Sequence, residues 1–128
     1  NPSRVILCHM NPSCKDQEYQ QALAARGAFI EYDMIGMEYI FEQGNSICPT
    51  DHESATGLAD LAEAGYANNL LLSQDVFLKS MLCAYGGKGY AFLLTDFLPR
   101  LLDYGFNQND ITQIMVSNSA NALKILSK

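Results

Sequence analysis

The sequence predicts an α/β fold, made of the last three βα units of a (β/α)8 barrel. Three apolar stretches, at about residues 4–10, 28–34 and 69–74, are each followed by a segment with helical periodicity. Each stretch carries a polar residue at or near its carboxyl end. Three parallel strands would leave two exposed sheet edges, and the 128 residues are about half of the roughly 250 that a complete barrel needs. We therefore treat residues 1–128 as one partial domain.

The first unit begins with residues 4–10, which read RVILCHM. Strand alternation places Leu7 and His9 on one face, and we expect Cys8 to face the helices as a core residue. Ser13 and Asp16 resemble a capping box that starts a helix ending near residue 26. The face of that helix expected to be buried carries Tyr19, Ala22 and Leu23.

The second unit begins with residues 28–34, which read AFIEYDM. Alternation places Glu31 and Asp33 on one face of the strand. Residues 35–50 show no regular period, and we interpret them as a long, functional loop. Residue 50 or 51 then begins a helix that runs to about residue 64.

The third unit begins with residues 69–74, where alternation places Leu71, Ser73 and Asp75 on one face. Asp75 is either a functional carboxylate at a strand end or the N-cap of a following helix. A glycine-rich segment follows it. The helices expected after this segment begin near Phe97, with Pro99 in the first turn, at Asn109, and at residue 118 or 119, the last running to about residue 126.

Composition restricts the classes of function. The net charge of −6 and the pI of about 4.6 argue against a nucleic-acid-binding groove. No apolar stretch approaches the roughly 18 residues of a membrane span. The four cysteines form no CxxC pair, which favours reduced thiols and a cytoplasmic protein. Because the chain begins with Asn1 rather than Met, we expect preceding residues to have been removed.

An independent small domain of the flavodoxin type is the alternative fold, but such domains normally use five strands. The residues themselves favour the barrel. The strings VILCHM, GAFIEYDMIG and NLLLSQDVFLKSMLCAYGGKGYAFLLTDFLPRL resemble, in this order, the C-terminal part of the phosphotriesterase family of the amidohydrolase superfamily. The closing DITQIMVSNSANALKIL is similar to the last two helices of that family, so the resemblance covers nearly the whole chain.

The resemblance implies a hydrolase with two divalent metals, usually zinc, at the strand ends of a complete barrel. His9 matches a metal-binding histidine of the sixth strand. Asp75 matches the eighth-strand aspartate, which binds a metal and takes a proton from the bridging water. Imidazole and carboxylate suit zinc, and a metal-bridging hydroxide would attack an ester, lactone, phosphoester or amide bond.

The chain also departs from the family pattern. It has no HxH motif, and we interpret His52 as a surface or capping residue. Met34 stands where phosphotriesterases carry a relay histidine, and Pro12 stands where an acid would follow His9. The resemblance therefore implies lactone, ester or amide hydrolysis in preference to paraoxon-like chemistry. The chain holds about two of the usual six ligands, so we expect it to be inactive on its own.

Lys88, Tyr90 and Asp33 are the weaker candidates for substrate binding. Lys88 lies among glycines that could let the backbone approach a phosphate or carboxylate, although an exposed loop lysine is the simpler interpretation. Tyr90 could line the pocket or pack the loop. Asp33 matches a family acid and could equally be a structural hydrogen-bond acceptor.

Two other functions stay open. A non-catalytic half-barrel could pair its apolar strand edges with a second copy, and a small module could bind an anion through the GGKG segment. The expected partners are a small-molecule substrate and either a second copy or the N-terminal half of the barrel, with no nucleic acid and no membrane.

Overall fold

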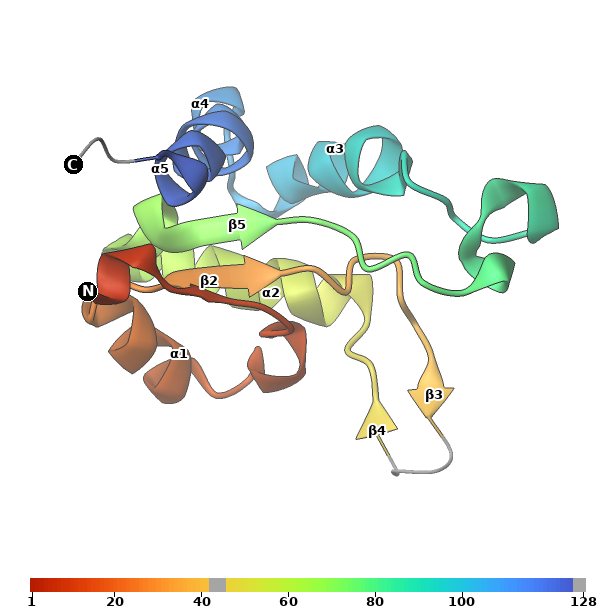
Figure 1. Cartoon of the computed structure of the whole chain (residues 1–128), viewed down its shortest axis with the longest axis horizontal. Helices are drawn as coiled ribbons and strands as arrows, with labels where there is room; N and C mark the ends of the chain where they lie inside the picture. Colours follow the sequence, from red (N-terminus) through yellow and green to blue (C-terminus); the bar gives the residue numbers. More distant parts are fainter. Residues whose placement is uncertain (42–45, 126–128) are drawn as a thin grey trace.

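The computed structural model describes residues 1–41 and 46–125. Three parallel strands form its central sheet in the order β1-β2-β5 (Figure 1). They are β1 (Ile6–Leu7), β2 (Phe29–Tyr32) and β5 (Leu70–Leu72). The predicted parallel α/β arrangement is confirmed. The strands are shorter than predicted because the backbone leaves the regular ladder just before each polar end, although the amides of Ser73 and Asp75 still bond to the β2 segment.

Helices cover one face of this sheet. Helix α1 (Gln17–Ala25) packs against β2 and against α2 (Asp51–Leu61), which a π-helical turn extends to Tyr66. A helical stretch contains a π-turn (Leu93–Phe97), α3 (Leu98–Leu101) and a 3-10 turn (Leu102–Tyr104). Another contains α4 (Gln108–Thr112), a π-turn (Gln113–Asn118) that packs on β5, and α5 (Ser119–Leu123).

The core lies between the sheet and these helices. Ile30 and Leu70 from neighbouring strands are fully buried there, together with Leu58 and Leu61 of α2. Side chains on the opposite face of β2 and β5 point away from this core, as the alternation predicts. Arg4 donates to the carbonyl of Lys124 over 2.9 Å, so the two ends of the described chain meet at the same side of the sheet (Figure 1).

Helix α1 differs from its prediction at both its cap and its buried face. Asp16 is the N-cap, accepting from the Tyr19 amide, while Ser13 belongs to a separate 3-10 turn (Asn11–Ser13). The buried residues are Gln20 and Ala24, whereas Tyr19 is exposed. Gln20 can be buried because its side-chain amide is hydrogen-bonded within the fold. The spacing of apolar residues cannot reveal these hydrogen bonds.

Helix α2 agrees closely with its prediction. Thr50 is the N-cap, and Glu53 completes a capping box with it. Gly65 has a φ of 93° and interrupts the helical conformation close to the predicted end. His52 is exposed, and its Nδ1 lies 2.6 Å from the Tyr104 hydroxyl, consistent with the predicted surface position.

The segment predicted as one long loop, residues 35–50, contains a short antiparallel hairpin of β3 (Ile40–Phe41) and β4 (Ser46–Ile47) that projects from the sheet (Figure 1). Residues 42–45 of that predicted loop lie outside the described residues. The loop interpretation is therefore wrong at residues 40–41 and 46–47, which pair as strands.

The C-terminal helices differ in where they begin. The helix containing Pro99 starts before Phe97, and a widened π-turn precedes the proline, which has no N–H and would crowd a regular turn. Asn107, rather than Asn109, caps α4. Asn118 caps nothing, because the helical backbone runs through it and its side chain donates to the carbonyls of Ala67 and Leu70. The predicted end near residue 126 lies outside the described residues.

Among the helices of the two described ranges, none combines the length and the apolar character needed to cross a bilayer.

Candidate metal and substrate site

The predicted site residues His9, Asp33 and Asp75 come together at the carboxyl ends of the three strands. Asp33 lies between the other two. Its carboxylate accepts the His9 backbone amide, with both oxygens 3.1 Å away, and its carbonyl accepts the Asp75 amide over 2.8 Å. The sheet therefore positions the two predicted metal ligands on either side of one buried aspartate.

The His9 imidazole is oriented by Asp33. Its Nδ1 lies 3.0 Å from Oδ1 of Asp33, which is buried, while the imidazole itself is 58% exposed. Burial raises the pKa of the Asp33 carboxyl, and the hydrogen bonds from His9 oppose that rise. An ionised Asp33 holds the proton on Nδ1 and leaves Nε2 as the nitrogen able to bind a metal. This arrangement is typical of metal-ligating histidines.

The backbone at His9 explains why Cys8 was placed on the wrong face. Leu7 packs on the helical core, so alternation turns Cys8 to the opposite face, where its thiol donates to Glu31 over 3.0 Å. His9 then has a φ of 56°, a left-handed conformation that ends the alternation and brings its imidazole to the face carrying Asp33. Cys8 is exposed in this chain and is not a core residue.

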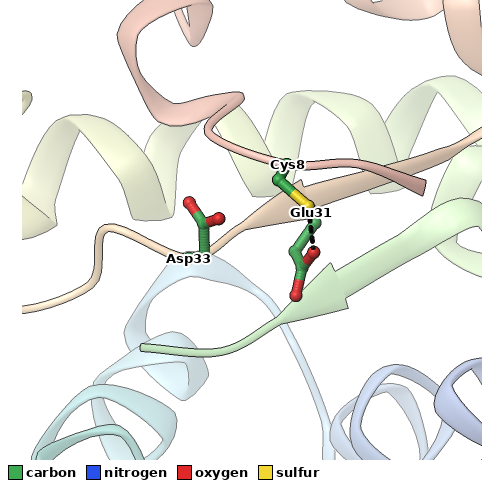
Figure 2. Close-up of side chains that lie close together, drawn as sticks. All are labelled: Cys8, Glu31 and Asp33. Atoms are coloured by element: carbon green, nitrogen blue, oxygen red, sulfur yellow. Dashed lines mark hydrogen bonds between the residues drawn. The ribbon is translucent and has the colours of Figure 1, made fainter. Parts of the chain in front are cut away.

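Cys8, Glu31 and Asp33 form a group of possible metal ligands, with one ligand atom of each within 4.8 Å of the others (Figure 2). The hydrogen bonds that these side chains already make argue against a metal site formed by these three residues. Glu31 already accepts from Cys8 and, over 2.8 Å, from Ser73, and Asp33 is engaged by His9. The hydrogen bond to Glu31 and burial raise the pKa of the Cys8 thiol to about 11, so it stays protonated at neutral pH. We interpret the Cys8–Glu31–Ser73 contacts as a polar layer beneath the site.

Buried polar side chains that the sequence interpretation missed support the segment around His9. Asn11, which is fully buried, accepts the Met34 amide over 3.1 Å and donates to Ser54 of α2 over 3.0 Å. Gln20 donates to the Met10 carbonyl and accepts from the Tyr32 hydroxyl over 2.7 Å. These contacts fix the backbone on both sides of the strand ends. The spacing of polar residues gave no signal for them, because these partners lie ten or more positions away in the sequence.

A pocket of about 290 Å3 opens beside Asp75. Its walls come from the loop after β2, residues 35–39, and from the loop after β5, residues 74–76, 80–81 and 86–89. Met37 and Met81 belong to these walls and to one buried apolar cluster. Asp75 is half-buried and lines the pocket, so a substrate in it would lie against this predicted ligand.

The three weaker candidates for substrate binding have different positions relative to the pocket. Lys88 lines the pocket, but its ammonium lies 3.2 Å from Asp51 and 3.8 Å from Glu38. Tyr90 is 70% exposed and is not among the residues that line the pocket. The Asp33 carboxylate already contacts the His9 imidazole, which agrees with the alternative interpretation of Asp33 as a structural hydrogen-bond acceptor.

The glycine-rich loop uses its backbone amides internally. Gly86, Gly87 and Gly89 donate to the carbonyls of Cys83, Leu82 and Met81 respectively. A Cβ on Gly87 would collide with the backbone of Met81, so the loop is folded tightly onto the preceding turns. These amides are therefore not available to cradle an anion, which argues against the anion-binding module.

Comparisons with known proteins agree with this geometry. The sequence model of the phosphotriesterase family matches residues 1–123. N-acetyltaurine hydrolase of Dictyostelium discoideum is 32% identical over 127 residues, covering 97% of this chain and 34% of that protein. A resiniferatoxin-binding protein from Rhodobacter sphaeroides is 46% identical with a TM-score of 0.94, over 95% of this chain and 34% of that one.

The phosphotriesterase homology protein of Escherichia coli, complexed with phosphate in its active site, is 28% identical with a TM-score of 0.70, over 93% of this chain and 38% of that one. The chain thus spans about a third of the length of the relatives it matches. The match to barrel proteins over this length confirms the predicted fold class, a part of a (β/α)8 barrel. The chain belongs to the phosphotriesterase family.

Proposed function

We propose that this chain supplies His9 and Asp75 as ligands to a binuclear metal-dependent hydrolase. The observation that carries the proposal is the bond between His9 Nδ1 and the buried Asp33 carboxylate, because it leaves Nε2 for a metal at the strand ends. Asp75, adjacent to Asp33 and half-buried in the pocket wall, is the second ligand. Imidazole and carboxylate together fit zinc.

The residues of this chain have separate tasks in that reaction. Two bound divalent metals would supply a nucleophilic water near neutral pH and polarise the bond to be cleaved. Asp33 holds the His9 ring in one orientation and one tautomer. The Asp75 carboxylate accepts the proton that the attacking water gives up. The pocket walls on either side of Asp75 hold the substrate and limit its contact with solvent.

The proposed substrates carry a lactone, ester or amide bond, with phosphoesters as a further class. The amide class is supported by the relative named N-acetyltaurine hydrolase. The relay residues of phosphotriesterases are replaced by Met34, whose amide binds Asn11, and by the exposed Pro12. Lys88, Tyr90 and Asp33 stay predictions as substrate-binding residues.

The experiment that tests the proposal compares two lengths of the protein. The purified 128-residue chain should show no metal-dependent turnover of esters, lactones or N-acyl amides, because two ligands bind zinc weakly. The natural protein, at the length the cell makes, should hydrolyse one of these classes and lose the activity on chelation. The activity should return with zinc. A natural protein that shows no turnover in any class with zinc present contradicts the proposal.

The strand edges favour a second candidate, a non-catalytic half-barrel that pairs with a second copy. Within the described ranges, β1 and β5 each bond only to β2, so each has an open edge. Light scattering on the 128-residue chain distinguishes the two: a dimer supports pairing, and a well-folded monomer at high concentration contradicts it. A small-molecule substrate and the N-terminal half of the barrel are the partners we propose for the catalytic alternative.

A further inference from the structure

Asp51 joins three segments that are far apart in the sequence. It is the first residue of α2 and is only 6% exposed. One carboxylate oxygen accepts the Gly36 amide over 2.7 Å, from the loop after β2. The other lies 3.2 Å from the ammonium of Lys88, in the loop after β5. A buried carboxylate needs such partners, because an uncompensated charge is costly to bury.

Lys88 is held on two sides. Its ammonium lies 4.4 Å from the centre of the Phe92 ring, a distance at which a cation is attracted to the ring face. Glu38 approaches it to 3.8 Å from the other loop, but this carboxylate is about half exposed, so its contribution is screened by water. The contact with Asp51 is therefore the stronger of the two ion pairs.

The two loops fit together where these residues meet. A Cβ at Gly36 would lie 2.8 Å from the Phe92 ring and 3.1 Å from the Lys88 side chain, so only glycine allows the approach. Gln74 adds a second connection at the base of the loop after β5, donating to the Gly89 carbonyl over 3.2 Å. The same loops form both walls of the pocket beside Asp75.

We propose that the Lys88–Asp51 ion pair is a clasp that fixes the width of the pocket, and that Lys88 is a positioning residue rather than a substrate contact. The inference rests on the proposed function for its catalytic consequence. Because the ammonium is already compensated by carboxylates, it offers little net attraction to an anionic substrate. Its loss should loosen the pocket for every substrate to a similar degree.

The test uses the natural protein with Lys88→Met, Asp51→Asn and the double variant. Each single change should raise KM about tenfold, the loss of about 1.4 kcal/mol of binding, with kcat within about twofold. The rise should be the same for a neutral ester and for a matched ester that carries a carboxylate. The double variant should be no worse than either single one, because both changes break one contact.

Two further variants provide the controls. Lys88→Arg keeps the charge and should restore most of the wild-type KM. Lys79→Met removes a lysine from the same loop that lies at the same 4.4 Å from an aromatic ring, that of Tyr85, but does not line the pocket. It should leave KM unchanged. If Lys88→Met raises KM only for the anionic ester, and Asp51→Asn does not, Lys88 contacts the substrate and the clasp is wrong.

Hydrogen exchange separates failure of the clasp from failure of the proposed function. In both single variants the Gly36 amide, which donates to Asp51, should exchange at least about tenfold faster, while the buried amides of β2 keep their protection. This measurement needs no activity. Unchanged exchange at Gly36 in both variants contradicts the clasp even in a protein that proves to be inactive.

Discussion

At the residue scale, the Asp33 carboxylate should determine how well His9 binds a metal. Asp33→Asn removes the charge that orients the imidazole, so zinc affinity of the natural protein should fall about tenfold to a hundredfold. Competition with a chromophoric chelator measures this directly. Asp60→Asn, an exposed carboxylate on α2, is the matched control and should change nothing. Equal affinities for the Asp33 variant and the wild type would contradict the role of Asp33 in orienting His9 for metal binding.

The reactivity of the Cys8 thiol is also determined at the residue scale, chiefly by its neighbour Glu31. Its thiol has a pKa of about 11 instead of 9.0, chiefly because it donates to Glu31. Glu31→Gln should lower the pKa toward 9.0 and increase the thiolate fraction at pH 8 by up to about a hundredfold, since 11 − 9.0 is two pH units. Alkylation of the 128-residue chain by iodoacetamide, followed by peptide mass analysis, reports this rate. An unchanged rate at Cys8, with Cys83 as the internal reference, would rule out the Glu31 contact.

At the element scale, the start of α2 depends on its capping box. Thr50→Ala leaves the Glu53 amide without its acceptor and should lower the free energy of unfolding by about 1 kcal/mol, measured in urea. Thr56→Ala is the control, since that exposed threonine lies within α2 and bonds only to the preceding turn. A Thr50→Ala chain as stable as the wild type would contradict the cap.

Glu53 makes this stability depend on pH. Hydrogen bonds from Lys15 and Thr50 lower the pKa of Glu53 from 4.5 to about 2 in the folded chain. A lowered folded pKa means that the stabilisation is complete above pH 4.5 and is lost as the pH falls toward 2. The stability difference between wild type and Glu53→Gln should therefore shrink between pH 5 and pH 3, whereas Glu63→Gln, an exposed control, should track the wild type. A constant difference would refute the contact.

The glycine-rich loop offers a pair of matched substitutions. Gly86 has a φ of 87° with open space at its Cβ position, so Gly86→Ala should cost about 1 kcal/mol of strain. Gly87→Ala would drive a methyl group into the Met81 backbone and should cost more, because the backbone itself must move. Thermal unfolding of both variants compares these costs. A smaller loss of stability for Gly87→Ala than for Gly86→Ala would mean that Gly87 does not pack tightly against the Met81 backbone.

Local sequence patterns predicted the helices and strands correctly where the spacing of apolar and polar residues alone determines the structure. The alternation in β2 correctly placed Glu31 and Asp33 on one face, and the structure turns that face away from the helical core. Of the two residues predicted as the start of α2, Thr50 is the cap. The same rule failed at His9, whose left-handed backbone brings its imidazole to the face of Asp33, where Cys8 also lies, and the contact with Asp33 joins residues 24 positions apart.

Which polar side chains are buried could also not be predicted from the sequence. Asn11 and Gln20 are fully buried by bonds to distant partners, and no local pattern distinguishes them from surface residues. For the candidate site, spacing could suggest which strand ends carry polar residues. The ion pair of Lys88 with Asp51 joins residues 37 positions apart and only the fold reveals it.

At the scale of the whole molecule, the three-strand sheet accounts for only part of the proposed site. The strands place His9 and Asp75 on either side of Asp33, but β1 and β5 each pair only with β2 in the described residues. The relatives are about three times as long as the part matched. The remaining ligands are therefore proposed to come from further strands of the same barrel.

The most direct test of this account is the metal content of the natural protein, measured together with its intact mass. We expect a mass well above 14.1 kDa and about two divalent metals per chain. His9→Ala and Asp75→Ala should each lower the metal content. A protein of 14.1 kDa that binds no zinc, or a longer protein whose metal content is unchanged by both substitutions, would contradict the assignment of His9 and Asp75 as ligands.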